Sequence, residues 1–181
     1  MSKLALGTAQ FGMNYGIGST SGKVEIGQVQ EILKYAKLAN IDMLDTAPSY
    51  GNSEKILGEV NVVDLKVVSK TRHIKNLKIT DEDLLSLNHD FETSLIDLKL
   101  DSIYGLLIHN TDDLIKPGAS KIIKFLENLK KVKKIEKTAA NAVSLCLHKF
   151  FKPSDNKKMI LSIRISLLYH FESQLFYGHV L

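Results

Sequence analysis

The chain has 181 residues, of which 44% are hydrophobic and 24% are charged, a balance typical of a soluble globular protein with one sizeable core. Cys146 is the only cysteine, which excludes an internal disulfide and makes a reducing, cytoplasmic location the default. No apolar run approaches the roughly 18 residues of a membrane-spanning helix, and the start of the chain lacks the features of a signal peptide. We therefore expect no membrane partner.

The net charge of +4 is unevenly distributed along the chain. Residues 1–113 hold 11 basic and 16 acidic side chains, giving −5, whereas residues 114–181 hold 13 and 4, giving +9. A basic segment can bind nucleic acid or an anionic surface. The lysines are scattered, however, and no nucleic-acid motif accompanies them, so we expect no nucleic-acid partner.

The first 130 residues alternate between short apolar runs and helical patterns. Strands are predicted at residues 4–6, 41–45, 65–69 and 102–108. Helical segments are predicted at residues 26–40, 53–59, 80–98 and 120–130. The third of these is the clearest, because Thr80 is a favoured N-cap and three acidic residues follow it in the first turn.

Strands that alternate with helices predict a parallel sheet covered by helices. The pattern alone leaves both the doubly wound sheet and the (β/α)8 barrel open. After residue 131 the pattern blurs, and residues 132–137 offer no clear strand. A full barrel needs eight βα units and about 250 residues, whereas this chain supplies four convincing units.

Four polar residues lie at or just beyond the ends of predicted strands: Asp45, Tyr50, Lys70 and His109. In a parallel barrel they would converge at the carboxyl ends of the strands, where barrel active sites lie. A lysine held by an aspartate could make a nearby phenol a proton donor, and a histidine could orient a substrate oxygen. Any one of these residues alone is more often structural, so the interpretation of the four as a site depends on the sequence around them.

The surrounding residues resemble the aldo/keto reductase family over roughly residues 3–131. The resemblance rests on LGTAQFG at 6–12, LDTAPSYGNSE at 44–54, SKT at 69–71 and LDSIYGLLIH at 100–109. It implies a TIM barrel that reduces a small aldehyde or ketone with NADPH. It also implies that Asp45, Tyr50, Lys70 and His109 form the catalytic tetrad, with Tyr50 as the proton donor. Gly7 and Thr8 are then expected near the nicotinamide.

The family pattern stops where the composition changes. We therefore expect a truncated TIM-type barrel, with an aldo/keto reductase-like half at residues 1–131 and a divergent basic tail at residues 132–181. Lysine codons are rich in adenine, so one hypothesis is that the tail is a frameshift product. The alternative to a reductase is a catalytically inactive half-barrel that persists by pairing its open sheet edges with itself or another chain.

Overall fold

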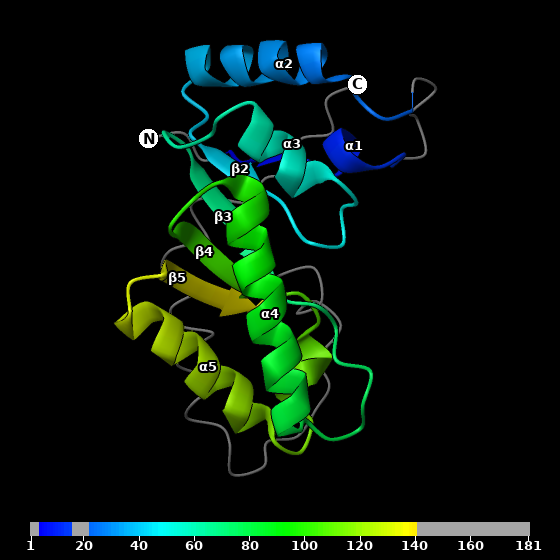
Figure 1. Cartoon of the computed structure of the whole chain (residues 1–181), viewed down its shortest axis with the longest axis vertical. Helices are drawn as coiled ribbons and strands as arrows, with labels where there is room; N and C mark the ends of the chain where they lie inside the picture. The colour runs from blue at the N-terminus through cyan, green and yellow to red at the C-terminus, as the bar shows by residue number, and fades with distance from the viewer. Residues whose placement is uncertain (1–3, 16–21, 141–181) are drawn as a thin grey trace.

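The chain folds into a parallel sheet with helices packed against it (Figure 1). The computed structural model describes residues 4–15 and 22–140. In chain order the elements are β1 (Leu6–Gly7), α1 (Ala9–Gly12), α2 (Ile26–Leu38), β2 (Met43–Asp45), α3 (Ser53–Glu59), β3 (Lys66–Lys70), α4 (Asp81–Leu98), β4 (Ile103–Ile108), the short 3-10 helix η1 (Thr111–Leu114), α5 (Ala119–Lys131) and β5 (Ile135–Ala140). None of the helices in these described ranges is long and apolar enough to cross a bilayer.

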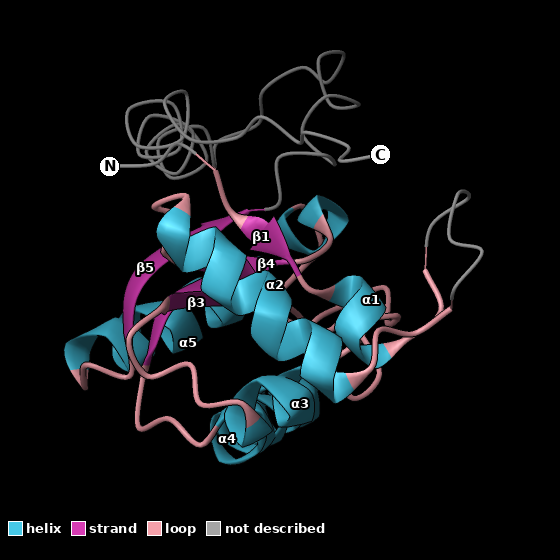
Figure 2. Ribbon diagram, turned by 90° about the horizontal axis from the view of Figure 1, so that it is seen from above, coloured by secondary structure: helices cyan, strands magenta, loops and turns pink. Residues whose placement is uncertain are grey.

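The strands follow one another across the sheet in the order β1-β2-β3-β4-β5, and every neighbouring pair is parallel. A doubly wound sheet reverses its strand order at a switch point, whereas this sheet advances by one strand at each step. The topology is therefore that of a barrel, and it settles the choice that the sequence pattern left open. Figure 2 shows the sheet curving from β1 to β5, with α3 and α4 side by side beneath it.

The expectation that residues 132–137 contain no clear strand is wrong, because β5 begins within them. β5 pairs with β4 from Ile103↔Ile135 through Ile108↔Ala140, so the sheet continues past that residue. Lys133, in the left-handed region at φ 60°, turns the chain from α5 into this strand. Ile135 is buried while Glu136 and Lys137 are exposed, and such a strand lacks the apolar run by which the others were recognised. Residues 141–181, the rest of the expected tail, lie outside the described residues.

Helix α4 confirms the sequence prediction in detail. The Thr80 hydroxyl accepts a hydrogen bond from the Asp83 amide, and the Asp83 carboxylate accepts one from the Thr80 amide, forming a capping box. At the other end Lys99 adopts φ 53° and terminates the helix. The face between these ends packs against the core through Leu87, Phe91, Leu95 and Leu98, all buried.

The close approach of α3 to α4 depends on a glycine. A Cβ atom built on Gly58 would lie 2.0 Å from the Asp97 backbone oxygen, which no side chain rearrangement relieves. The contact brings α3 against α4 and seats Leu57 in the core, where it is fully buried. Gly58 thus sets the position of the short helix that follows the Tyr50 turn.

We expect Gly58→Ala to destabilise the chain by about 1–3 kcal/mol or more, because overpacking against backbone atoms cannot be relieved locally. The matched control is Gly27→Ala in α2, where a Cβ meets nothing within 4 Å and the helix gains up to about 1 kcal/mol. Urea unfolding followed by circular dichroism measures both changes. Equal stabilities for the two variants would contradict the proposed close packing of α3.

Candidate active site

The Lys70 ammonium lies at the centre of a group of polar side chains at the carboxyl ends of β2 and β3. Its Nζ donates to both carboxylate oxygens of Asp45 at 2.8 Å and to the Thr46 carbonyl oxygen at 3.0 Å. The Tyr50 hydroxyl oxygen lies 3.1 Å away. The arrangement expected from the sequence, with Lys70 between Asp45 and Tyr50, is present, and Lys70 is only 3% exposed.

The direction of the Lys70–Tyr50 bond determines what the phenol can do. An ammonium has donors only, so the Tyr50 oxygen accepts this hydrogen bond. The phenolic hydrogen therefore points elsewhere and is available to another acceptor. Tyr50 is half-buried, so part of the residue is open to solvent.

Strand register brings Asp45 and Lys70 to the same face. Asp45 pairs with Val68, and Lys70 is two residues further along β3, so both side chains point to the same side of the sheet. Tyr50 follows in a tight turn, with its amide bonded to the Ala47 carbonyl oxygen at 3.0 Å. Gly51 then adopts φ 60°, and a Cβ atom added there would lie 2.6 Å from the Gly12 backbone oxygen, so this position requires glycine.

Three buried hydroxyl groups hold the Tyr50 turn against the first strand. Ser53 Oγ lies 2.8 Å from Thr8 Oγ1 and 2.9 Å from the Thr8 carbonyl oxygen, and Thr46 Oγ1 donates to Ser53 at 3.3 Å. Thr8, Thr46 and Ser53 are all fully buried. Sequence reasoning assigned no role to Thr46 or Ser53, because only the fold brings these loops together.

The cofactor contact expected for Gly7 and Thr8 remains a prediction. Gly7 is exposed, and a Cβ at that position would meet nothing within 4 Å, which leaves space for a ligand beside the backbone. The Thr8 hydroxyl, in contrast, donates to the Asp45 carbonyl oxygen at 3.1 Å and contacts Ser53. The Thr8 side chain therefore makes its hydrogen bonds inside the protein.

His109 follows β4 at the same end of the sheet. Burial lowers the pKa of its imidazole, the nearby Lys70 charge lowers it further, and Asp45 opposes the shift. The neutral ring is therefore favoured, and a neutral imidazole offers one donor and one acceptor. Its backbone amide is anchored 3.3 Å from the Thr71 hydroxyl oxygen, which links the ends of β3 and β4.

A second polar cluster, which the sequence did not reveal, lies beside His109. Asp113 in η1 is 1% exposed and accepts from the Ile74 amide at 3.1 Å and from Lys116 Nζ at 2.7 Å. His73, in the loop after β3, has Nδ1 3.2 Å from an Asp113 oxygen. The cluster ties together the loops that follow β3 and β4. Nowhere in residues 4–15 and 22–140 do three or more potential ligands form a metal site.

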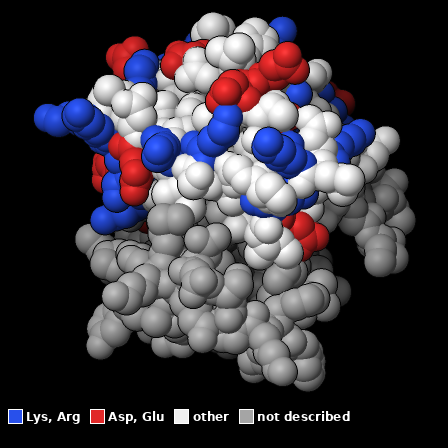
Figure 3. Space-filling model, turned by 90° about the horizontal axis from the view of Figure 1, so that it is seen from below, with Lys and Arg blue, Asp and Glu red and all other residues white. Residues whose placement is uncertain are grey.

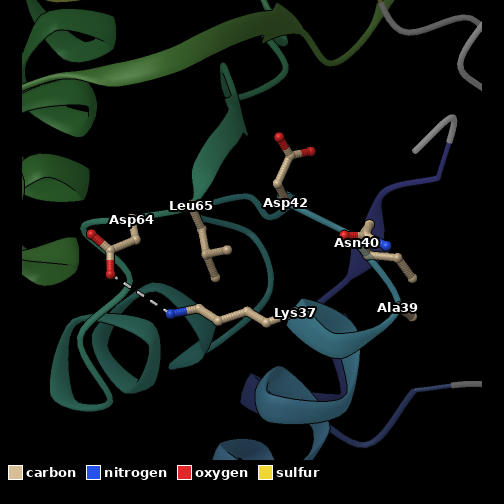
Figure 4. A pocket seen from close by; sticks show the side chains of 7 residues that line it. Lys37, Ala39, Asn40, Asp42, Asp64 and Leu65 are labelled. Atoms are coloured by element: carbon tan, nitrogen blue, oxygen red, sulfur yellow. Dashed lines mark ion pairs between the residues drawn. The ribbon is translucent and has the colours of Figure 1, made fainter. Parts of the chain in front are cut away.

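A large open cavity lies at the opposite end of the strands, away from this site (Figure 4). It has a volume of about 770 Å³ and is lined by Lys37, Ala39, Asn40, Ile41, Asp42, Asp64 and Leu65. Its charges are paired, since Lys37 lies 3.8 Å from Asp64 and Asp42 accepts from Lys66 at 2.6 Å. The mutually contacting side chains of Asp45, Lys70 and Tyr50 lie instead at the carboxyl ends of the strands.

Both basic and acidic side chains lie on the described part of the molecular face that Figure 3 shows. Among the described residues, Arg72 is paired with Asp90 and Lys121 with Asp81. Exposed pairs of this kind contribute little to stability. The absence of a nucleic-acid partner remains a prediction.

The chain is similar to proteins of known family and structure. A model of the aldo/keto reductase family matches residues 3–157. Two solved structures described as aldo-keto reductases from Pseudomonas aeruginosa are 26% and 25% identical, with TM-scores of 0.63 and 0.61. Both cover 77% of this chain, which in turn covers 55% and 54% of theirs. The chain thus spans about half the length of these structures.

A thermostable aldo-keto reductase in complex with the inhibitor epalrestat is 24% identical, with a TM-score of 0.54, over 77% of this chain and 49% of its own. At that identity the likeness shows the fold alone. A search of curated proteins gives no significant match.

The lowered pKa of His109 predicts a pH dependence of stability. Between its folded pKa and about 6.5, the unfolded chain binds more protons than the folded chain, so the free energy of unfolding falls as the pH falls. The contribution of His109 to the free energy of unfolding is fully present above about pH 6.5. We expect the wild type to lose more stability than His109→Gln between about pH 8 and about pH 5. Urea unfolding across this range measures the free energy of unfolding of both proteins. A difference between them that does not change with pH would contradict the lowered pKa of His109.

Proposed function

Because the chain belongs to the aldo/keto reductase family, we propose that it is an oxidoreductase that reduces the carbonyl group of a small aldehyde or ketone with NADPH. The proposal assigns Asp45, Tyr50, Lys70 and His109 to the reacting site. The observation that carries it is the Tyr50 hydroxyl 3.1 Å from a buried ammonium, with its hydrogen free to point toward a substrate.

Proton transfer from Tyr50 supplies one half of the reaction. As hydride reaches the carbonyl carbon, electron density moves to the carbonyl oxygen, which takes the phenolic proton and becomes a hydroxyl group. The negative charge left on the Tyr50 oxygen forms next to the Lys70 ammonium, which stabilises it. Asp45 keeps that ammonium charged and fixes its direction with two hydrogen bonds.

His109 orients the substrate in this scheme. Its neutral ring can donate a hydrogen bond to the carbonyl oxygen without competing with Tyr50 for the proton-donor role. The substrate oxygen would then lie between two donors, the Tyr50 hydroxyl in the turn after β2 and the His109 ring after β4. Such convergence restricts how the carbonyl faces the incoming hydride.

The cofactor part of the proposal rests on fewer residues of this chain. When bound, NADPH supplies the hydride. The exposed Gly7 backbone, with open space at its Cβ position, fits the approach of a flat ring at this end of the sheet. The family resemblance assigns the phosphate and adenine contacts mostly to the second half of the barrel. NADPH binding therefore needs its own measurement.

A second candidate follows from the sheet edges in the described residues. β1 pairs with β2 and β5 pairs with β4, so the five described strands form an open sheet. An open edge presents unpaired amide and carbonyl groups that can pair with another strand. In this alternative the chain is a catalytically inactive half-barrel that pairs with a second copy. Sedimentation equilibrium that gives a dimer, together with no NADPH binding, would favour it.

The reductase proposal predicts a specific loss in Tyr50→Phe. We expect carbonyl-dependent oxidation of NADPH to fall by roughly 10²–10⁴-fold, the usual contribution of a positioned acid. NADPH affinity, measured by nicotinamide fluorescence, should change little, because only a hydroxyl group is removed. Tyr35→Phe on α2 is the matched control, since that side chain is 67% exposed and outside the site. Full activity in Tyr50→Phe would exclude the proposed proton donor.

A further inference from the structure

Glu54 is a buried carboxyl group that the proposed proton transfer does not use. It is the second residue of α3 and is 4% exposed. Ser69 Oγ donates to its Oε1 at 2.6 Å. Burial raises the pKa of this carboxyl, and hydrogen bonds from Ser69 and Ser94 oppose the rise. Three elements therefore meet at this group: α3 through Glu54, β3 through Ser69 and α4 through Ser94.

The positions of Glu54 and Ser69 in the chain connect them to the site. Glu54 follows Tyr50 by four residues, and Ser69 directly precedes Lys70. Successive side chains of a strand point to opposite faces. Ser69 thus faces α3 behind the sheet, while Lys70 faces Asp45 and Tyr50 in front of it. The Glu54–Ser69 bond joins, from behind, the two segments that carry the Tyr50–Lys70 pair.

We propose that Glu54 is a positioning residue that holds the Tyr50 turn against β3 through Ser69 and so maintains the contact between Tyr50 and Lys70. What this positioning serves rests on the proposed function; the positioning itself does not.

Two other contacts near the turn act in a different direction. Ser53 binds Thr8, and a Cβ at Gly12 would lie 1.8 Å from the Tyr50 carbonyl oxygen, so these contacts fix the turn against the first strand and its loop. Glu54 instead binds the strand that carries Lys70. If Glu54 is lost, the buried hydroxyls of Ser69 and Ser94 lose an acceptor, which favours local opening of the α3–β3 contact.

The experiment measures the protection of Lys70, which needs neither cofactor nor activity. The full-length chain is treated with an amine-reactive reagent, and labelling of each lysine is followed by peptide mass spectrometry. Lys70 is held by Asp45, Thr46 and Tyr50, so its labelling is slow while the turn is in place. We expect Glu54→Ala to accelerate labelling of Lys70 by about tenfold through local opening.

Two further variants separate positioning from general loss of stability. Glu54→Gln retains an acceptor for Ser69 and should remain within about twofold of the wild type. Leu129→Ala removes a buried side chain from α5, far from this contact in the chain. It should lower the thermal midpoint without a selective effect on Lys70. All measurements are made at a temperature at which circular dichroism shows each variant folded.

Labelling of Lys70 in Glu54→Ala no faster than in Leu129→Ala would overturn the proposal, as would equal acceleration in Glu54→Gln and Glu54→Ala. Should Glu54→Ala fail to fold, Ser69→Ala deletes the partner hydroxyl and should also accelerate Lys70 labelling selectively. In an active chain Glu54→Ala should lower kcat and leave KM nearly unchanged. An inactive wild type that shows the expected labelling pattern would exclude the proposed reductase and leave the positioning role intact.

Discussion

Burial of the Lys70 ammonium is the constraint around which this end of the molecule is organised. A charge that is 3% exposed loses most of its hydration, which costs several kcal/mol unless it is paired and hydrogen-bonded. The Asp45 carboxylate and the Thr46 carbonyl oxygen offset that cost. With those bonds made, the ammonium presents a fixed donor to Tyr50. The ammonium whose burial costs free energy is thus the same group that can stabilise a phenolate on Tyr50.

The loops around Lys70 are held by two sets of contacts. Buried hydroxyls of Thr8, Thr46 and Ser53 join the ends of β1 and β2 to the start of α3. Behind the sheet, the Glu54–Ser69 bond joins α3 to β3, and Gly58 allows α3 to approach α4 closely. These groups are neutral or enclosed, so water competes little for their hydrogen bonds. Such support keeps a side chain on a turn in one place.

The sequence predicted the parts of the structure that depend on local pattern. Apolar runs located four strands of the sheet, and the capping box at Thr80 located the start of α4. The apolar pattern did not predict the fifth strand, because exposed Glu136 and Lys137 interrupt its run of apolar residues. Its pairing with β4 stabilises it as a strand, and pairing between distant segments leaves little trace in a local window.

For the site, the sequence alone named Asp45, Tyr50, Lys70 and His109, since polar residues that end apolar strands must find partners at the same edge of a parallel sheet. The tertiary structure decided which of them touch, and in which direction the Lys70–Tyr50 bond runs. It also decided that Thr8 turns inward, that His73 meets Asp113, and that Glu54 is enclosed behind the sheet. Burial and long-range contact determine those roles, and both arise only when segments far apart in the chain are packed together.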